Sequence, residues 1–514
     1  MVIKVGMLVV FFCVMIGVGL YCRKNATDVN GFVLGGRKVG PWLTAFAYGT
    51  SYFSAVIFIG YAGQFGWKFG VSSTWIGIGN AIIGSLFAWL LLGRRTRLMT
   101  QHLKSRTMPD FFGNRFDSKG LKIAASLIVF IFLIPYTASL YNGLSRLFGM
   151  AFHLDYTVCI IMMAVLTGIY VIAGGYMATA INDFIQGIIM LIGIVSVIVA
   201  VLNSHGGLGE AVSKMAQVTD ASANATNGEF ASLFGPDPLS LVFVVILTSL
   251  GTWGLPQMVQ KFYAIKDTEA IKKGTIISTI FALIVAGGCY FLGGFGRLYD
   301  INVAEVGYDA IVPTMLENLS PILVAVVVVL VLSASMSTLS SLVLTSSSTL
   351  TLDMIKDNVI KDMDEKKQVF VMRLFIVVFV AISAVIAVVQ YKSKVTFIAQ
   401  LMGISWGALA GAFLAPFIYS LYWKGVTKAA VVVNFIFGTL LMTTNLLDNM
   451  FFHKIFPKLM SSPINCGTVA MLGGLVLVPV VSLLTKKLPE QKVSAVFECY
   501  DKKEEAQEKK AKAV

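Results

Sequence analysis

Long apolar runs, separated by short polar segments, follow one another along almost the whole chain. A helix needs about 20 apolar residues to cross a bilayer, so each run predicts one membrane-spanning helix. The pattern predicts about 13 spans: 4–22, 42–64, 71–93, 121–148, 156–173, 181–202, 238–262, 272–296, 315–352, 369–390, 395–422, 428–446 and 466–485. We therefore expect an all-α polytopic protein with one membrane domain, residues 1–485, and a charged tail, residues 486–514, that is loose or partly helical.

Two of the predicted spans are interrupted at their middle. Small and polar residues gather there: Gly49, Thr50, Ser51 and Ser54 in the span 42–64, and Gly251, Gly254 and Pro256 in the span 238–262. Proline removes a backbone donor and glycine loosens a helix, so both positions are expected unwinding points. They lie five spans apart, which predicts two inverted repeats, about 42–202 and 238–422, with broken helices lining a midplane site. The alternative is that these residues serve only packing or a kink.

Hydroxyl groups are dense in the middle of the predicted span 315–352. Ala334, Ser337, Thr338, Ser341 and Thr345 share one helical face by their spacing. Hydroxyls and unwound carbonyls can replace the water shell of a hard cation, so Ser337 and Thr338 are predicted cation ligands. The alternative is bonding back to the carbonyl four residues earlier, together with close helix packing. That alternative is preferred for the hydroxyls near the helix end, Ser346, Ser347, Ser348 and Thr349.

Asp183 is the most informative acidic residue of the predicted spans, because apolar residues follow it directly in the span 181–202. A carboxylate inside a membrane segment indicates function by default. The alternative is an interfacial acid that caps the start of the helix, beside Asn182.

Composition and charge support the membrane assignment. The chain is 57% hydrophobic and only 13% charged, against roughly 25% charged residues in soluble domains. Its net charge of +13 comes from Lys and Arg in the segments 94–119, 266–273, 356–367 and 502–510, which the span count places on one side. Such loops face the cytoplasm. We therefore expect a plasma (inner) membrane protein with an external N-terminus and a cytoplasmic C-terminus, and no nucleic-acid partner.

Catalytic chemistry has no visible basis in the sequence. The four histidines fall in predicted loops, the six cysteines are scattered, and no nucleophile, base and orienting group gather within the membrane. The chain is not expected to be an enzyme or to hold a cofactor. Four residues are candidates to contact a small polar solute, although each alone is also typical of a helix core or interface: Tyr136, Tyr141, Asn142 and Trp253.

At these residues the chain resembles the sodium:solute symporter family, which includes proline, pantothenate, monocarboxylate, sialic acid and sugar cotransporters. Four segments carry the resemblance, within a match of roughly residues 5–485: "FVLGGRKVGPWLTAFAYGTSYFSA" (32–55), "TMPDFFGNRF" (107–116), "GGYMATAINDFIQG" (174–187) and "SASMSTLSS" (333–341). The resemblance implies a leucine-transporter-type fold with one leading helix, two five-helix inverted repeats and two trailing helices.

The resemblance also implies sites. A first sodium site would use carbonyls of Thr50, Phe53 and Ala334 and hydroxyls of Ser337 and Thr338. A second site, present in some members, would use Asp183 with Ser337, Ser340 and Ser341. The substrate would lie between the spans 42–64, 121–148 and 238–262. Its candidate contacts are Ser51, Tyr52, Ser54, Tyr136, Asn142, Thr252, Trp253 and Gln257.

The implied function is sodium-coupled secondary active symport, importing a small organic solute by alternating access. Proline-type members carry aspartate where this chain has Tyr52 and methionine where it has Phe53. Pantothenate- and monocarboxylate-type members are more similar there, so the expected solute is pantothenate, a monocarboxylate or a proline-like compound. The alternatives are sugar or sialic acid symport, a sodium-conducting channel and a membrane sensor. Sodium stoichiometry and oligomeric state are left open.

Overall fold

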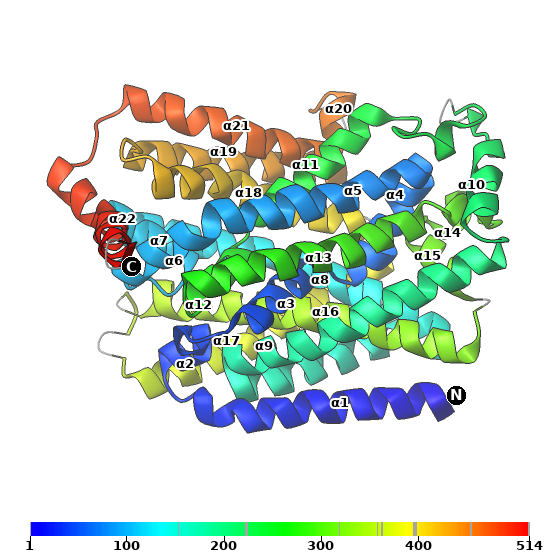
Figure 1. The fold of residues 1–514 in the computed structure, drawn as a ribbon, viewed down its shortest axis with the longest axis horizontal. Helices are drawn as coiled ribbons and strands as arrows, with labels where there is room; N and C mark the ends of the chain where they lie inside the picture. Colours follow the sequence, from blue (N-terminus) through cyan, green and yellow to red (C-terminus); the bar gives the residue numbers. More distant parts are fainter. Residues whose placement is uncertain are drawn as a thin grey trace.

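The computed structural model describes residues 2–152, 154–221, 225–317, 319–356, 358–360, 363–393, 398–452 and 455–511. In these ranges the regular structure is helical, and the long helices run side by side along the long axis of the molecule (Figure 1). Ten described helices are long and apolar enough to cross a membrane, or 11 with one bent pair. The all-α polytopic fold class is confirmed, whereas the number of 13 spans stays a prediction.

The first half of the chain contains the first broken helix. Its elements are α1 Val2–Cys22, α2 Val29–Leu34, α3 Pro41–Tyr52, η3 Val56–Tyr61, α4 Ala62–Phe69, η4 Gly70–Ser73, α5 Thr74–Gly79, η5 Asn80–Phe87, η6 Trp89–Gly93, α6 Arg94–His102, α7 Met108–Phe116, α8 Lys119–Phe152 and α9 Tyr156–Ser204. Gly175 interrupts α9 with a φ of 57°. A left-handed backbone favours glycine, and the break separates the two predicted spans 156–173 and 181–202.

The second half repeats the succession of long helices. Its elements are α10 Leu208–Gln217, α11 Pro238–Gly254, α12 Pro256–Ala264, α13 Thr268–Gly293, α14 Val303–Val306, α15 Ile311–Glu317, α16 Pro321–Thr349, η11 Leu350–Ile355, α17 Glu365–Ser393, α18 Ile398–Tyr422, α19 Lys428–Leu447, η12 Asp448–Phe452, α20 Lys458–Ser461, α21 Pro463–Leu484 and α22 Glu490–Ala511. Figure 1 shows α1 along one edge of the bundle and α19 and α21 along the opposite edge. These leading and trailing helices thus flank a central group.

Both predicted interruptions are real breaks with nearly the same backbone conformation. Phe53 follows α3 with φ −82° and ψ 121°, and Leu255 separates α11 from α12 with φ −81° and ψ 122°. The second break lies where the sequence predicts it, between Gly254 and Pro256, and bends the helix pair by 46°. The first break lies at Phe53, inside the expected cluster and directly before Ser54, whereas Gly49 to Ser51 remain helical.

Close packing explains why Gly49 is not an unwinding point. A Cβ atom at this position would lie 2.4 Å from the ring of Phe281 on α13. The glycine therefore lets α3 approach α13. A glycine is needed here for close packing and not for an unusual backbone conformation.

The hydroxyl-rich helix α16 lies inside the bundle. In its most apolar stretch 83% of the residues are buried, against 22% in α1. It packs against α9, α8 and α3. The serine and threonine side chains of α16 thus face other helices and not lipid, which makes the interior of the bundle the place to look for a polar site.

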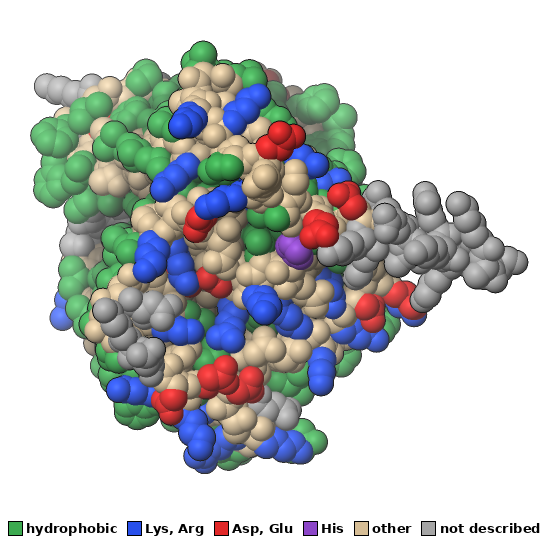
Figure 2. All heavy atoms as spheres, turned by 90° about the vertical axis from the view of Figure 1, so that its left-hand side faces the viewer, with side chains coloured by type: hydrophobic (Ala, Val, Ile, Leu, Met, Phe, Trp, Pro, Cys, Tyr) green, Lys and Arg blue, Asp and Glu red, His purple; other side chains and the backbone are tan. Residues whose placement is uncertain are grey.

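The two ends of the bundle differ in charge. The N-terminus and the C-terminus lie at opposite ends (Figure 1), and Figure 2 shows Lys and Arg side chains gathered on the end that carries α22. Of the two forms expected for the tail, loose or partly helical, the structure has the helical one, and α22 packs on α6. Its Val493 and Phe497 are buried, and the hydroxyl of Tyr500 donates to the carbonyl of Arg95 at 3.2 Å.

Candidate cation and substrate sites

The hydroxyl of Thr338 on α16 faces the break in the first broken helix. Its Oγ1 lies 3.2 Å from the carbonyl oxygens of both Thr50 and Phe53 and 3.1 Å from that of Ala334. A hydroxyl carries one hydrogen, so it cannot donate fully to all three carbonyls at once. Several oxygen atoms therefore share one proton, and such an oxygen-rich group is the ligand set of a hard cation.

The end of α3 makes two of these carbonyls available. Thr50 and Phe53 lie in or just after its last turn, where carbonyl groups have no partner within the helix. The same end carries the negative pole of the helix dipole, which attracts a cation. Thr338 also donates to the carbonyl of Ala334, four residues earlier on its own helix. Bonding back within α16 therefore explains this contact, but not the contacts with Thr50 and Phe53 at the end of α3.

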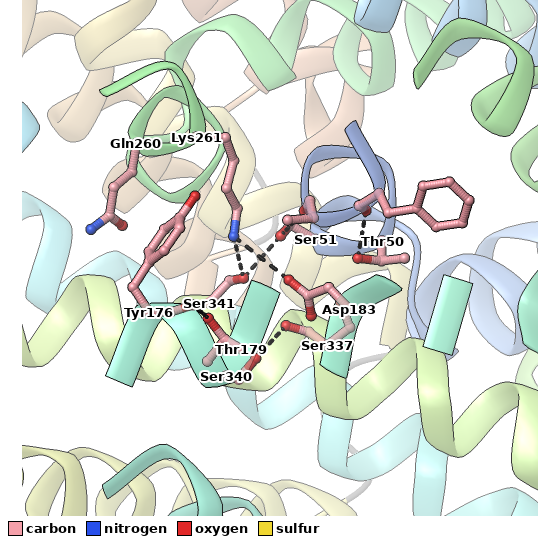
Figure 3. A network of polar contacts seen from close by, with 12 residues as sticks. Thr50, Ser51, Tyr176, Thr179, Asp183, Gln260, Lys261, Ser337, Ser340 and Ser341 are labelled. Carbon is pink, nitrogen blue, oxygen red and sulfur yellow. Dashed lines mark hydrogen bonds and ion pairs between the residues drawn. The ribbon is translucent and has the colours of Figure 1, made fainter. Parts of the chain in front are cut away.

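Ser337, the fifth residue of the predicted first site, directly precedes Thr338 on α16. Its side chain is buried, and its hydroxyl lies beside the carboxylate of Asp183 (Figure 3). The Ser337 side chain therefore lies near Asp183, which belongs to a second polar group around α16.

A lysine occupies the centre of this second group. The ammonium of Lys261, on α12, donates to the hydroxyl of Ser341 at 3.0 Å and lies 3.9 Å from Oδ2 of Asp183 (Figure 3). The hydroxyl of Ser341 in turn lies 2.9 Å from that of Ser51 on α3. The Lys261 and Asp183 side chains are only 3% and 0% exposed. Buried charges need such pairing, and this pair joins α3, α9, α12 and α16.

The capping alternative for Asp183 is wrong. The residue lies within α9, beyond the break at Gly175, and is fully buried. Of the other hydroxyls predicted for the second site, Ser340 donates to the carbonyl of Ser337 at 2.8 Å. That hydroxyl is therefore satisfied within its own helix, whereas Asp183 and Ser341 meet through Lys261.

Some predicted substrate contacts lie near the two breaks. Tyr136 on α8 is buried and packs its ring edge-on against Trp406 with centroids 6.0 Å apart. Gln257 lies in the first turn of α12, buried, and its amide has no hydrogen bond among the described residues. The hydroxyl of Ser54 accepts from the amide of Val56 at 3.2 Å. The side chain of Tyr52 lies outside the described part of the structure.

Other predicted contacts have partners elsewhere. Thr252 donates to the carbonyl of Gly84 at 3.0 Å, and the indole of Trp253 donates to that of Ile83 at 2.9 Å. Both residues thus hold α11 against η5. Asn142 is hydrogen-bonded to Gln390 and Tyr156. It lines a cavity of about 550 Å³ at the end of the bundle where α14 lies (Figure 1).

Sequence reasoning missed Lys261. It is the one charged residue of the predicted span 238–262 and stands next to its end, where a lysine normally reaches back to the membrane surface. One feature of the sequence indicates that Lys261 is buried: the apolar and aromatic run continues beyond it through Phe262 and Tyr263.

Residues 32–438 match the model of the sodium:solute symporter family. The osmoregulated proline transporter of Bacillus subtilis is 29% identical over 488 residues, which cover 93% of this chain and 94% of that protein. The sodium/proline symporter of Staphylococcus aureus is 31% identical over 450 residues, covering 85% of this chain and 84% of that protein.

The fold is shared with a solved structure of a Na⁺-coupled sialic acid symporter in a substrate-bound outward-open state. The TM-score is 0.74 at 16% identity, over 95% of this chain and 99% of that chain. The predicted leucine-transporter-type fold class is thereby confirmed. The chain belongs to the sodium:solute symporter family, and it is a multi-pass membrane protein that couples solute transport to sodium.

Proposed function

We propose that this symporter imports a small solute with a carboxylate group, with proline as the first compound to test, and that sodium binds beside Thr338. The convergence of the Thr50, Phe53 and Ala334 carbonyls on the Thr338 hydroxyl carries the proposal for sodium. The two relatives described above support the proposal for proline. Both are named as proline transporters, and the similarity to this chain extends over most of their length.

Sodium at this position would connect α16 to the end of α3. It would bind the oxygen lone pairs of the three carbonyls and of the Thr338 hydroxyl, whose hydrogen would turn away from the ion, and so fix the break at Phe53 that borders the solute site. Such ordering is a coupling free energy, which acts in both directions. Bound solute should therefore tighten sodium binding by the same factor by which sodium tightens solute binding.

The solute would lie among Ser54, Tyr136 and Gln257. The first turn of α12 directs backbone N–H groups and partial positive charge toward a carboxylate, and Gln257 lies in that turn. The paired rings of Tyr136 and Trp406 offer an apolar wall for the rest of the molecule. Asn142, in its cavity near α14, would meet the solute on the way in.

One observation favours a second candidate. Tyr52 stands where proline-type members carry aspartate, and a carboxylate there would suit a solute with a positive charge. A monocarboxylate or pantothenate, which has no such charge, is therefore the second solute class to test.

The proposed orientation has the basic end in the cytoplasm. Lys119, Lys122 and Lys356 line one pocket at that end, and Figure 2 shows many basic side chains on the same end. Positive loops remain on the cytoplasmic side of membrane proteins. In this orientation the N-terminus is external and the cavity beside Asn142 opens to the outside. We also propose that residues 1–485 form one transport domain with core repeats at about 42–202 and 238–422.

The driving force sets the size of the expected signal. A potential of ~100 mV contributes about 2.3 kcal/mol per sodium ion, and a tenfold sodium gradient contributes about 1.4 kcal/mol. One sodium ion with a neutral zwitterion thus sustains accumulation of roughly several hundred-fold. With a monovalent anion the cycle would be electroneutral and only the chemical gradient would count.

Uptake into sealed proteoliposomes tests the proposal. An inward sodium gradient is compared with a potassium control for labelled proline, lactate, pyruvate, pantothenate, sialic acid and glucose. Sodium-dependent accumulation of proline above equilibrium is the expected result. Accumulation of a different panel member instead would replace proline, and sodium entry without any solute movement would favour a channel.

A further inference from the structure

The strongest unexplained feature of the interior is the buried ammonium of Lys261. It contacts Asp183 and Ser341, which are two of the side chains that a second sodium ion would use. The face of Tyr176 lies 5.2 Å from the same nitrogen and adds a favourable contact for a cation. The position between Asp183 and Ser341 is thus already occupied by a positive charge of the protein.

Sodium and this ammonium exclude each other. Metal–oxygen distances for hard cations are about 2.3–2.6 Å, so an ion bound to both Ser341 Oγ and Asp183 Oδ2 would share the space of the Lys261 nitrogen, 3.0 and 3.9 Å from those atoms. Two cations this close in a weakly polar interior repel strongly. One carboxylate, that of Asp183, balances one positive charge and not two.

The ammonium also makes the connection between helices that a bound ion would make. Lys261 belongs to α12, the second half of a broken helix, whereas Asp183 belongs to α9 and Ser341 to α16. Ser341 meets Ser51, which directly follows Thr50, and the carbonyl of Thr50 accepts from the Thr338 hydroxyl. The chain of contacts therefore runs from α12 to the proposed sodium site.

We infer that the Lys261 ammonium is a tethered second cation, which fills the position between Asp183 and Ser341, so that the transporter binds one sodium ion and supplies the second positive charge itself. The inference rests on the proposed sodium site at Thr338 and is independent of which solute is carried. Lys261 is here a positioning residue that joins α12 to α9 and α16.

Counting sodium ions tests this inference directly. Equilibrium binding of ²²Na⁺ is measured on the purified full-length protein in lipid nanodiscs, without solute. The wild-type protein is expected to bind one sodium ion per chain. Two ions per chain in the wild type would overturn the inference.

Variants at position 261 sharpen the count. Lys261→Met removes the ammonium and leaves Asp183, so a second sodium ion should bind and the count should rise to two. Lys261→Arg keeps the charge and should bind one ion. Lys266→Met is the matched control, because Lys266 is exposed on the loop after α12, and it should also bind one ion. A monodisperse Lys261→Met protein that binds only one ion would overturn the inference.

A charge-neutral double variant covers the case in which Lys261→Met does not fold. Asp183→Asn combined with Lys261→Met removes both charges and should keep the one ion at Thr338. Loss of that ion would mean that Asp183 is a ligand of the single sodium, and the inference would fail. One bound ion without uptake of any panel solute refutes the proposed substrate and leaves the role of Lys261 standing.

Discussion

Two polar groups lie less than one helical turn apart on α16, and they differ in the charge that the protein supplies. Around Thr338 the groups are neutral, with carbonyls of Thr50, Phe53 and Ala334 facing one hydroxyl. Around Ser341 the groups are charged, with the Lys261 ammonium between a carboxylate and two hydroxyls. In our proposal the first group takes a cation from solution, whereas the Lys261 ammonium already lies in the second.

The difference separates two roles that the family resemblance assigns to similar residues. A neutral group of oxygen atoms can bind and release an ion from solution, because no charged side chain of the protein occupies the position. A buried ion pair matters for folding. Removing one partner leaves an uncompensated buried charge, which lowers the free energy of unfolding. Substitutions near Thr338 should therefore change sodium affinity, and substitutions near Asp183 should change stability.

The largest effect is expected for Asp183→Asn. It leaves the buried ammonium of Lys261 without a counter-charge, which costs about 3–5 kcal/mol, so the thermal unfolding midpoint in detergent should fall well below that of the wild type. Protein that remains folded should still bind one sodium ion. The double variant with Lys261→Met should recover most of the lost stability. A wild-type unfolding midpoint for the single variant would remove the contrast between the two groups.

Thr338→Ala should have the next largest effect, on sodium and not on folding. Hydrogen bonds and similar contacts of a hydroxyl with a charged group are worth about 1.5–3 kcal/mol, so the sodium concentration for half-maximal uptake should rise roughly 10- to 150-fold. Thr338→Ser keeps the hydroxyl and serves as the control. Unchanged sodium dependence in Thr338→Ala would argue against the first site.

Ser337→Ala should show an intermediate effect, since Ser337 directly precedes Thr338 and its hydroxyl lies beside the Asp183 carboxylate. Loss of one neutral ligand is worth about 0.5–1.5 kcal/mol and predicts a roughly two- to tenfold rise in the half-maximal sodium concentration. The measurement is the sodium dependence of initial uptake. A shift in stability without a shift in sodium dependence would place Ser337 with Asp183 and not with Thr338.

Ser341→Ala should have the smallest effect on sodium. It removes the hydroxyl that joins Lys261 to Ser51, so the maximal uptake rate should fall by up to roughly tenfold. The half-maximal sodium concentration should stay within about twofold of the wild-type value. A large sodium shift in this variant would show that Ser341 is an ion ligand, contrary to the tethered-cation inference.

Much of the fold follows from local patterns in the sequence. Long apolar runs predicted the membrane helices, and the Gly254–Leu255–Pro256 stretch predicted the second break at its correct place, because proline and glycine act on the backbone next to them. The first break lies at Phe53, inside the predicted cluster from Gly49 to Ser54, whereas Gly49 itself stays helical and packs against the ring of Phe281 on another helix. No local pattern reveals such a contact.

The sites divide in the same way. Spacing alone placed Ala334, Ser337, Thr338 and Ser341 on one face of α16, but the neighbours of each residue come from other helices. Thr252 and Trp253, next to the second break, face η5 through their hydrogen bonds to Gly84 and Ile83. A residue beside a break can point in several directions, and only its packing partners decide which.

The sequence by itself determined the membrane helices, the second break and the hydroxyls of α16, since these depend on hydrophobicity, backbone chemistry and helical period along one segment. Only the tertiary structure decided that Lys261, 80 residues from Ser341 in the chain, reaches that hydroxyl. The bend between α11 and α12 turns the lysine inward, and Asp183 on α9 provides the charge that keeps it there. A buried charge is stable only with a partner, and that partner comes from folding.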